Sequence, residues 1–238
     1  RIYMSNLTSP PQQIVDDSTL SGDLSWPSLS TDGNSLLFAS DATGKGDVYS
    51  YGIRTRELTQ LISSKHSEMA PRFHSDGRVA YTRKLGSGED LFVLNNGESS
   101  RWAKGSGDQT RPNWAGDSVV YFTNERTNGS WDIAVTAEGK RRKFLAKSVR
   151  LPFRAPPSLS PDKKWVAYGH EDPAKSSRIW FARVDGSATK SYKTGLVAAG
   201  EPNLIERDGR IYLSFTALPA QGSDWRRLHV ADVTDLIK

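Results

Sequence analysis

The sequence has no cysteine, few histidines and no long apolar run. Without cysteine, the 238 residues cannot form a disulfide framework, a thiolate metal site or a cysteine nucleophile. The longest apolar stretches, such as SLLFAS from Ser35 and VVYF from Val119, fall far short of the roughly 20 residues that a membrane-spanning helix needs. We therefore expect no membrane insertion.

Motifs for common enzyme chemistry are also missing. The sequence contains no GxSxG nucleophile turn, no HExxH zinc motif and no GxxxxGK[ST] phosphate loop. The histidines are scattered singly, with no pair at metal-ligand spacing: His66, His74, His170 and His229. We predict that the chain is not an enzyme by itself and has neither a cofactor nor a metal site.

What the sequence does contain is a repeat marked by proline. Five segments align on it: SWPSLSTDG, MAPRFHSDG, TRPNWAGDS, APPSLSPDK and GEPNLIERDG. Their prolines are 44, 41, 45 and 45 residues apart: Pro27, Pro71, Pro112, Pro157 and Pro202. An acidic residue follows each proline by five positions, or by six in the last copy. A fixed period in this range indicates a repeat architecture.

Each repeat continues with short segments typical of β-strands. An apolar run with an aromatic residue comes first, then a Gly-rich polar stretch, then a second apolar run, and in four copies a shorter last segment. Asp-Gly and Gly-Asp pairs between the runs predict tight turns. Four strands in about 40 to 45 residues match one blade of a β-propeller. We predict an all-β fold with no sustained helix.

These residues resemble the TolB-type (WD40-like) β-propeller repeat, most clearly in SWPSLSTDGNSLLFASDATGKGDVYSYGIRTRELTQL. The resemblance covers residues 25–235 and implies blade geometry rather than an activity. The fourth copy departs from the pattern, since Arg178 stands where the others have Asp47, Asp90 and Asp132. We expect these recurring acids to cap turns rather than to bind calcium, because each occurs once per blade.

We predict a single domain, residues 1–238, that forms one propeller of five blades with four antiparallel strands each. The expected blades are residues 25–66, 67–108, 109–152, 153–197 and 198–238, with residues 1–24 closing the last blade through the strand at 12–16. A six-bladed TolB-like ring is the alternative.

Side-chain alternation along the innermost strand predicts a polar channel. The residue two positions after each proline is apolar, so we expect this set to pack between blades: Leu29, Phe73, Trp114, Leu159 and Leu204. The flanking positions then face the channel and supply candidate binding residues: Trp26, Ser28, Arg72, Arg111, Asn113, Ser158, Glu201 and Asn203. Arginine there can hold a carboxylate or a peptide terminus. A channel that holds only water is the alternative.

The charge of +5 is diffuse, so we expect no nucleic-acid partner, although Trp102 and Trp225 lie near basic residues. We expect both tryptophans to pack between blades. The TolB-type resemblance implies a non-catalytic protein-interaction scaffold or adaptor in a bacterial envelope complex, located in the periplasm, whose partner is another protein or peptide. The alternatives are a substrate-gating propeller joined to a hydrolase, with further domains of the same polypeptide as partners, and a propeller that binds carbohydrate or a small ligand.

Overall fold

The computed structural model describes residues 1–5, 10–124, 129–150, 156–171, 177–220, 222–223 and 225–238. In these ranges the chain forms 21 β-strands and a single four-residue helix, α1 (Thr234–Ile237). This helix is too short to cross a membrane, and the described residues contain no other. The chain divides into two compact units, Arg1–Lys104 and Gly105–Lys238, which are described separately.

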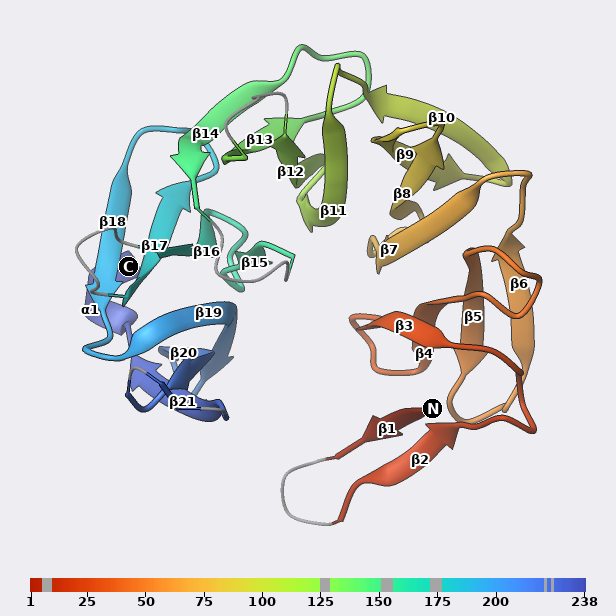
Figure 1. The fold of residues 1–238 in the computed structure, drawn as a ribbon, viewed down its shortest axis with the longest axis horizontal. Helices are drawn as coiled ribbons and strands as arrows, with labels where there is room; N and C mark the ends of the chain where they lie inside the picture. Colours follow the sequence, from red (N-terminus) through yellow and green to blue (C-terminus); the bar gives the residue numbers. More distant parts are fainter. Residues whose placement is uncertain (6–9, 125–128, 151–155, 172–176, 221, 224) are drawn as a thin grey trace. The chain divides into compact units, whose positions relative to one another are not determined.

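The N-terminal unit holds a two-stranded sheet and two four-stranded blades (Figure 1). The small sheet pairs β1 (Ile2–Met4) with β2 (Gln12–Val15). The first blade consists of β3 (Leu24–Leu29), β4 (Ser35–Ser40), β5 (Asp47–Gly52) and β6 (Leu58–Ile62). The second blade consists of β7 (Ser67–Phe73), β8 (Val79–Leu85), β9 (Gly88–Asn95) and β10 (Glu98–Ala103). In each blade, strands adjacent in sequence pair antiparallel.

The C-terminal unit holds three blades, followed by α1. The third blade consists of β11 (Asp108–Ala115), β12 (Ser118–Asn124), β13 (Trp131–Thr136) and β14 (Lys143–Val149). The fourth consists of β15 (Ser158–Leu159), β16 (Trp165–Glu171), β17 (Ser177–Arg183) and β18 (Thr189–Lys193). The fifth has three described strands, β19 (Val197–Arg207), β20 (Arg210–Leu218) and β21 (Arg227–Asp232).

The predicted fold class is confirmed: the chain is all-β, with five propeller blades, most of them four-stranded. The segment expected to complete the last blade, Gln12–Val15, pairs with Ile2–Met4 in a sheet of its own. Closure of the fifth blade by residues 1–24, and the organisation of residues 1–238 as one domain, stay predictions.

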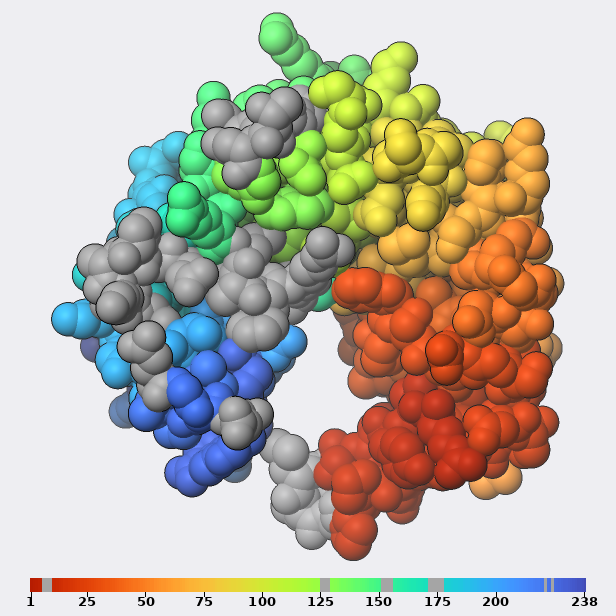
Figure 2. All heavy atoms as spheres, viewed as in Figure 1, coloured from red at the N-terminus to blue at the C-terminus, as the bar shows by residue number. Residues whose placement is uncertain are grey.

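Apolar faces of neighbouring sheets form the cores. In the N-terminal unit, Leu37 and Val48 of the first blade pack with Val79 and Tyr81 of the second. Figure 2 shows side chains filling the space between these two blades, in the orange and yellow part of the chain. In the C-terminal unit, the alternation along β20 buries Leu213 and every second neighbour against the fourth blade. The alternation of apolar and polar residues that predicts the strands therefore also forms the apolar sheet faces through which neighbouring blades pack.

The recurring Ser-x-Asp segment forms a turn between the first two strands of a blade. In the first blade, the Asp32 carboxylate accepts hydrogen bonds from the Ser30 hydroxyl at 2.6 Å and from the Asn34 N–H at 3.0 Å. In the fourth blade, Asp162 accepts from Ser160 at 2.6 Å and from the Lys164 N–H at 3.1 Å. The motif therefore forms a turn that is held by hydrogen bonds within the segment itself. This turn fixes the register of the first and second strands of the blade.

The thermal stability of the fold is expected to depend on pH through the aspartates of these turns. The Ser30 hydroxyl, followed by the Asn34 amide, lowers the pKa of Asp32 from 3.8 to about 2, and contact with His74 lowers that of Asp76 to about 2. Because the folded-state pKa is depressed, the stabilisation is complete above about pH 4 and is lost as pH falls through 2. We expect the melting temperature to fall between pH 4 and pH 2, and to fall less in the double variant Asp32→Asn/Asp76→Asn. Thermal unfolding at stepped pH measures this, and equal slopes for the two proteins would contradict it.

The recurring buried acids on the third strands bind residues of the fourth strands. Asp47 accepts a hydrogen bond from Gln60 Nε2 at 3.2 Å, and Asp132 accepts one from the Ser148 N–H at 2.8 Å. Asp90 forms an ion pair with Arg101. These acids therefore bridge strands rather than only capping turns.

Arg178 stands in the fourth blade where the other blades have the recurring acid, and it also links two strands. In the fourth blade, Arg178 Nη1 donates to Ser191 Oγ at 3.2 Å, from β17 to β18. The arginine replaces the repeated acid and still ties the third strand to the fourth.

Candidate functional site

A bulge interrupts the innermost strand beside the repeated proline. The strand register shifts there in the first, second, third and fifth blades. The residue before the proline has a positive φ in all four: Trp26 (56°), Ala70 (51°), Arg111 (55°) and Glu201 (53°). Positive φ is unusual for residues with large side chains and stores strain. Simple alternation, on which the channel prediction rests, therefore does not hold across this position.

In the N-terminal unit, three of the predicted binding residues lie at or beside the bulge. Trp26 is half-buried on β3, and Ser28 follows it on the same strand, also half-buried. Arg72, on β7, is half-buried and its Nη1 donates to the Pro71 carbonyl at 2.8 Å. Burial lowers the pKa of Arg72 to about 10, so the guanidinium is still charged at neutral pH. These side chains offer one aromatic surface and one cation.

In the C-terminal unit, the two bulge residues have different surroundings. Arg111 is buried, with 6% of its surface exposed, and its guanidinium lies 6.0 Å from the centre of the Trp131 ring. Glu201 is exposed and accepts a hydrogen bond from Thr216 Oγ1 at 2.7 Å. Arg226 donates to the same hydroxyl at 2.8 Å and to the Ala198 carbonyl at 2.8 Å. Arg226 was absent from the predicted site because only the fold brings it beside β19.

Three predicted binding residues hold neighbouring blades together. Asn113 Nδ2 donates to the Pro157 carbonyl at 2.9 Å, which links the third blade to the fourth. Ser158 Oγ donates to Asn203 Oδ1 at 3.2 Å and accepts from the Leu204 N–H at 3.1 Å, which links the fourth to the fifth. These contacts give Asn113, Ser158 and Asn203 a structural task. The prediction that all eight residues line one channel involves both units and stays a prediction.

The apolar positions after the proline are buried in three blades, at Trp114, Leu159 and Leu204. Phe73 is half-buried. The prediction was wrong for Leu29, which is 50% exposed. The small sheet β1–β2 packs on other residues of the first blade, and Leu29 is left lining an apolar hollow of about 230 Å³.

The last blade exposes three large apolar residues, Trp225, Leu228 and Val230. Trp225 was expected to pack between blades, and this was wrong, because 52% of its surface is exposed and Arg227 stacks on its ring at 4.2 Å. Leu228 and Val230, on β21, are 69% and 62% exposed. The alternating pattern that reveals a strand does not tell whether another element covers it.

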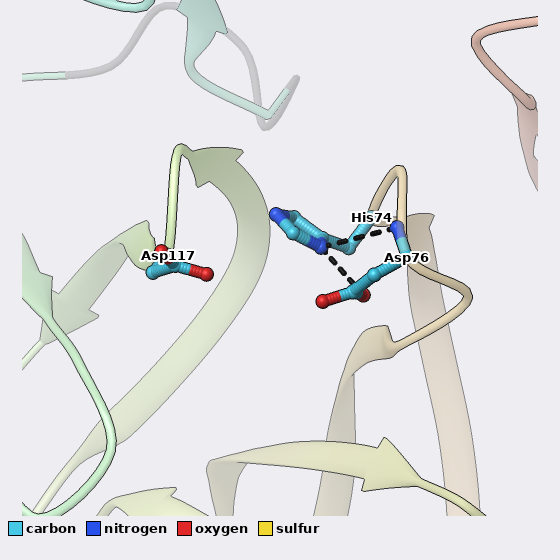
Figure 3. A group of neighbouring side chains, drawn as sticks. All are labelled: His74, Asp76 and Asp117. Carbon is cyan, nitrogen blue, oxygen red and sulfur yellow. Dashed lines mark hydrogen bonds and ion pairs between the residues drawn. The ribbon is translucent and has the colours of Figure 1, made fainter.

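His74 and Asp76 form a close pair of groups that are able to bind a metal ion. His74 Nδ1 lies 2.6 Å from Asp76 Oδ1, within one turn of the second blade (Figure 3). Asp117, also drawn in Figure 3, belongs to the C-terminal unit and is not counted with them. The Arg78 side chain binds the same Asp76 carboxylate at 2.9 Å. The pair is thus part of the repeated turn, with histidine in place of the serine of the first and fourth copies.

Solved structures that are similar in fold to this chain are known. A search of curated protein sequences finds no match. Among solved structures, TolB from Acinetobacter baumannii is similar with a TM-score of 0.65 and 19% identity, over 81% of this chain and 48% of that one. The chain thus spans about half the length of that protein. The putative TolB from Agrobacterium tumefaciens has a TM-score of 0.68 and 18% identity, over 90% and 78%.

An acylaminoacyl peptidase from Pyrococcus horikoshii is also similar in fold, with a TM-score of 0.61 and 16% identity, over 88% of this chain and 37% of the peptidase. At such identities the structural matches concern the fold alone. The sequence itself matches the family model of the TolB β-propeller domain over residues 1–202. With most of its length matched and its repeats folded as propeller blades, the chain belongs to the TolB β-propeller domain family.

Proposed function

We propose that this propeller is a non-catalytic protein-interaction module that serves as a scaffold or adaptor in a bacterial envelope complex, in the periplasm. The observation that carries the proposal is the bulge before the repeated proline. Its backbone is the same in four blades, whereas its side chain differs in each: Trp26, Ala70, Arg111 and Glu201. Bulges re-aim side chains, and strained backbone is concentrated at binding sites, so a constant bulge that carries different side chains supports a recognition role.

The chemistry of the accessible residues fits a protein or peptide. Trp26 offers an aromatic surface, Arg72 a cation and Glu201 an exposed carboxylate. Tryptophan and arginine are the residues that most often dominate binding energy at protein interfaces. An arginine whose surroundings exclude water binds a carboxylate more strongly than one in bulk solvent. Arg72 is therefore proposed to hold an acidic side chain or the C-terminus of the partner.

A second candidate follows from the fold similarity to the acylaminoacyl peptidase, of which this chain matches 37%. In that case the propeller would control access to a hydrolase domain of the same polypeptide. The two proposals differ in what the bulge residues do. A scaffold needs them for capture, whereas a gating propeller needs them for substrate entry and captures no stable partner. A carbohydrate or small-ligand binder remains the third proposal.

Glycine variants at the bulge test the scaffold proposal. Because glycine adopts positive φ without the cost of roughly 1 to 2 kcal/mol that other residues incur, Trp26→Gly/Glu201→Gly removes both side chains while sparing the backbone. With the chain as bait for envelope proteins, we expect the captured partner to decrease about tenfold in the double variant. Quantitative mass spectrometry of the bound fraction measures this.

The matched control is Asp208→Gly, which also replaces a positive-φ residue, in the exposed turn before Gly209. It is expected to capture as much partner as the parent chain. Unchanged capture by the double variant, or equal loss in the control, would refute the proposed site. Circular dichroism should give the same spectrum for all three proteins.

A further inference from the structure

The turn between the third and fourth strands of the second blade consists of an asparagine followed by a glycine. Asn96 and Gly97 join β9 to β10, and Asn95 pairs with Glu98 directly beside them. The φ angle is positive at both turn residues, 48° for Asn96 and 83° for Gly97, as the tightest hairpin turns require. Both residues are exposed. Water and base therefore have access to this turn.

An asparagine side chain can react with the backbone of the residue that follows it. The backbone nitrogen of that residue loses its proton to base and attacks the side-chain Cγ, so that a C–N bond forms and ammonia leaves with the side-chain nitrogen. Water then opens the resulting cyclic imide at either carbonyl, which gives aspartate or isoaspartate. The reaction consumes water and releases ammonia, and it needs no oxidant or reductant. Glycine in the second position favours it, because no Cβ hinders the approach of the two groups.

Both reacting groups are unobstructed in the Asn96 turn. Among the residues that the structure describes, the Gly97 N–H donates to no acceptor and the Asn96 side chain has no hydrogen-bond partner. An N–H that is already hydrogen-bonded would have to break that bond before it could lose its proton. Here only the pairing of Asn95 with Glu98 closes the turn, so a local opening is enough to let the side chain reach the Gly97 nitrogen.

Asn34 shows the opposite arrangement in the first blade. It is also exposed and is followed by a small residue, Ser35. However, Asn34 Nδ2 donates to Asp32 Oδ2 at 3.0 Å, and the Ser35 N–H donates to Ser30 Oγ at 2.9 Å. The turn therefore holds both of the groups that would have to react. The other Asn-Gly pair of the sequence, residues 128 and 129, begins outside the described residues.

We propose that Asn96 is a modification site of the folded protein, where water converts the asparagine through a cyclic imide to aspartate and isoaspartate. The conversion places a carboxylate beside the exposed Glu98 at the start of the outer strand β10. Isoaspartate also adds a carbon to the backbone of the turn, which disturbs the pairing of Asn95 with Glu98 that the turn sets. The site is separate from the bulge residues, so the inference goes beyond the proposed function and does not depend on it.

Ageing of the full chain at mildly alkaline pH tests the inference. One sample is kept folded and another unfolded in guanidinium chloride, and trypsin then releases Asn96 in the peptide Leu85–Arg101. Mass spectrometry measures the conversion from the amide-to-carboxylate mass shift, and electron-transfer fragmentation locates it. We expect folding to change the rate at Asn96 by less than about threefold, because the turn opens locally. At Asn34 we expect folding to slow the rate at least about tenfold, because two hydrogen bonds must break first. Equal slowing at both asparagines, or no conversion at Asn96 in the folded chain, would overturn the proposal.

Two variants complete the test. Asn96→Gln keeps the amide but lengthens the side chain, so the imide ring would be larger and forms more slowly. After ageing, the parent peptide is expected to accept methyl groups from a protein isoaspartate methyltransferase, and the Asn96→Gln peptide is expected to accept none. The matched control Asn34→Gln replaces the hydrogen-bonded asparagine and is expected to leave conversion at Asn96 unchanged. Conversion of the parent peptide without isoaspartate would exclude the imide and overturn the proposed route.

Discussion

Replacing Arg83 by methionine is expected to lower the free energy of unfolding by about 3 to 5 kcal/mol. The Glu68 carboxylate is fully buried, and Arg83 Nε binds it at 2.8 Å. The Ser64 hydroxyl donates to the same oxygen at 2.6 Å, and the guanidinium also covers the Phe92 ring at 4.6 Å. Methionine keeps much of the apolar stem but leaves a buried carboxylate without its cation. Urea unfolding followed by tryptophan fluorescence measures the loss.

Two controls separate the charge effect from packing. Adding Glu68→Gln to Arg83→Met removes the uncompensated charge and is expected to recover more than half of the lost stability. Arg183→Met breaks a pair with Asp185 at 3.1 Å, where both groups are partly exposed, and is expected to cost less than about 1 kcal/mol. A similar cost for Arg83→Met and Arg183→Met would show that burial of Glu68 does not matter.

Phe181→Ala is expected to cost about 3 to 5 kcal/mol, the range for removing a buried aromatic ring. Phe181 is fully buried on β17, in the core shared by the fourth and fifth blades with Leu213 and Ile237. Alanine leaves a cavity there that a sheet on each side cannot close. Equilibrium unfolding in urea gives the change.

Phe144→Ala is the matched control for the ring deletion. Phe144 lies half-buried on β14, beneath Arg142 at 5.2 Å and Lys147 at 5.0 Å. We expect its removal to cost about 1 kcal/mol, since solvent already reaches the site. If both alanine variants lose equal stability, the shared core is not what holds these blades.

The sequence predicted the blades well because each repeat carries its own local signals. The Asp208-Gly209 pair forms the turn between β19 and β20, where both residues have positive φ, as Asp-Gly pairs favour. The apolar runs became the second and third strands because alternation and β-branched residues fit a sheet between two neighbours. These are interactions between residues close in sequence, which a single sequence reveals.

The candidate site was less predictable, for physical reasons. A bulge adds one residue to a strand, so the side chains beyond it exchange faces. No residue type in the sequence indicates where such a shift occurs. A residue that precedes proline, as Trp26 and Arg111 do, is by itself expected to have an extended backbone. The exposure of Trp225 and Leu228 depends on whether another element covers this part of the last blade, and neither residue carries that information. Such properties arise from the assembled sheets rather than from local sequence.

The hydrogen bonds that join inner strands have a consequence for how the C-terminal unit comes apart. Asn113 reaches the carbonyl of Pro157, and Ser158 reaches Asn203, so each blade supplies partners to the next. In arrays whose repeats interact only with neighbours, cooperativity depends on how strong the junctions are relative to each repeat. Opening the fourth blade here would strip partners from both adjacent blades at once. We therefore expect its three repeats to unfold together, with the fourth blade as the link between the third and the fifth.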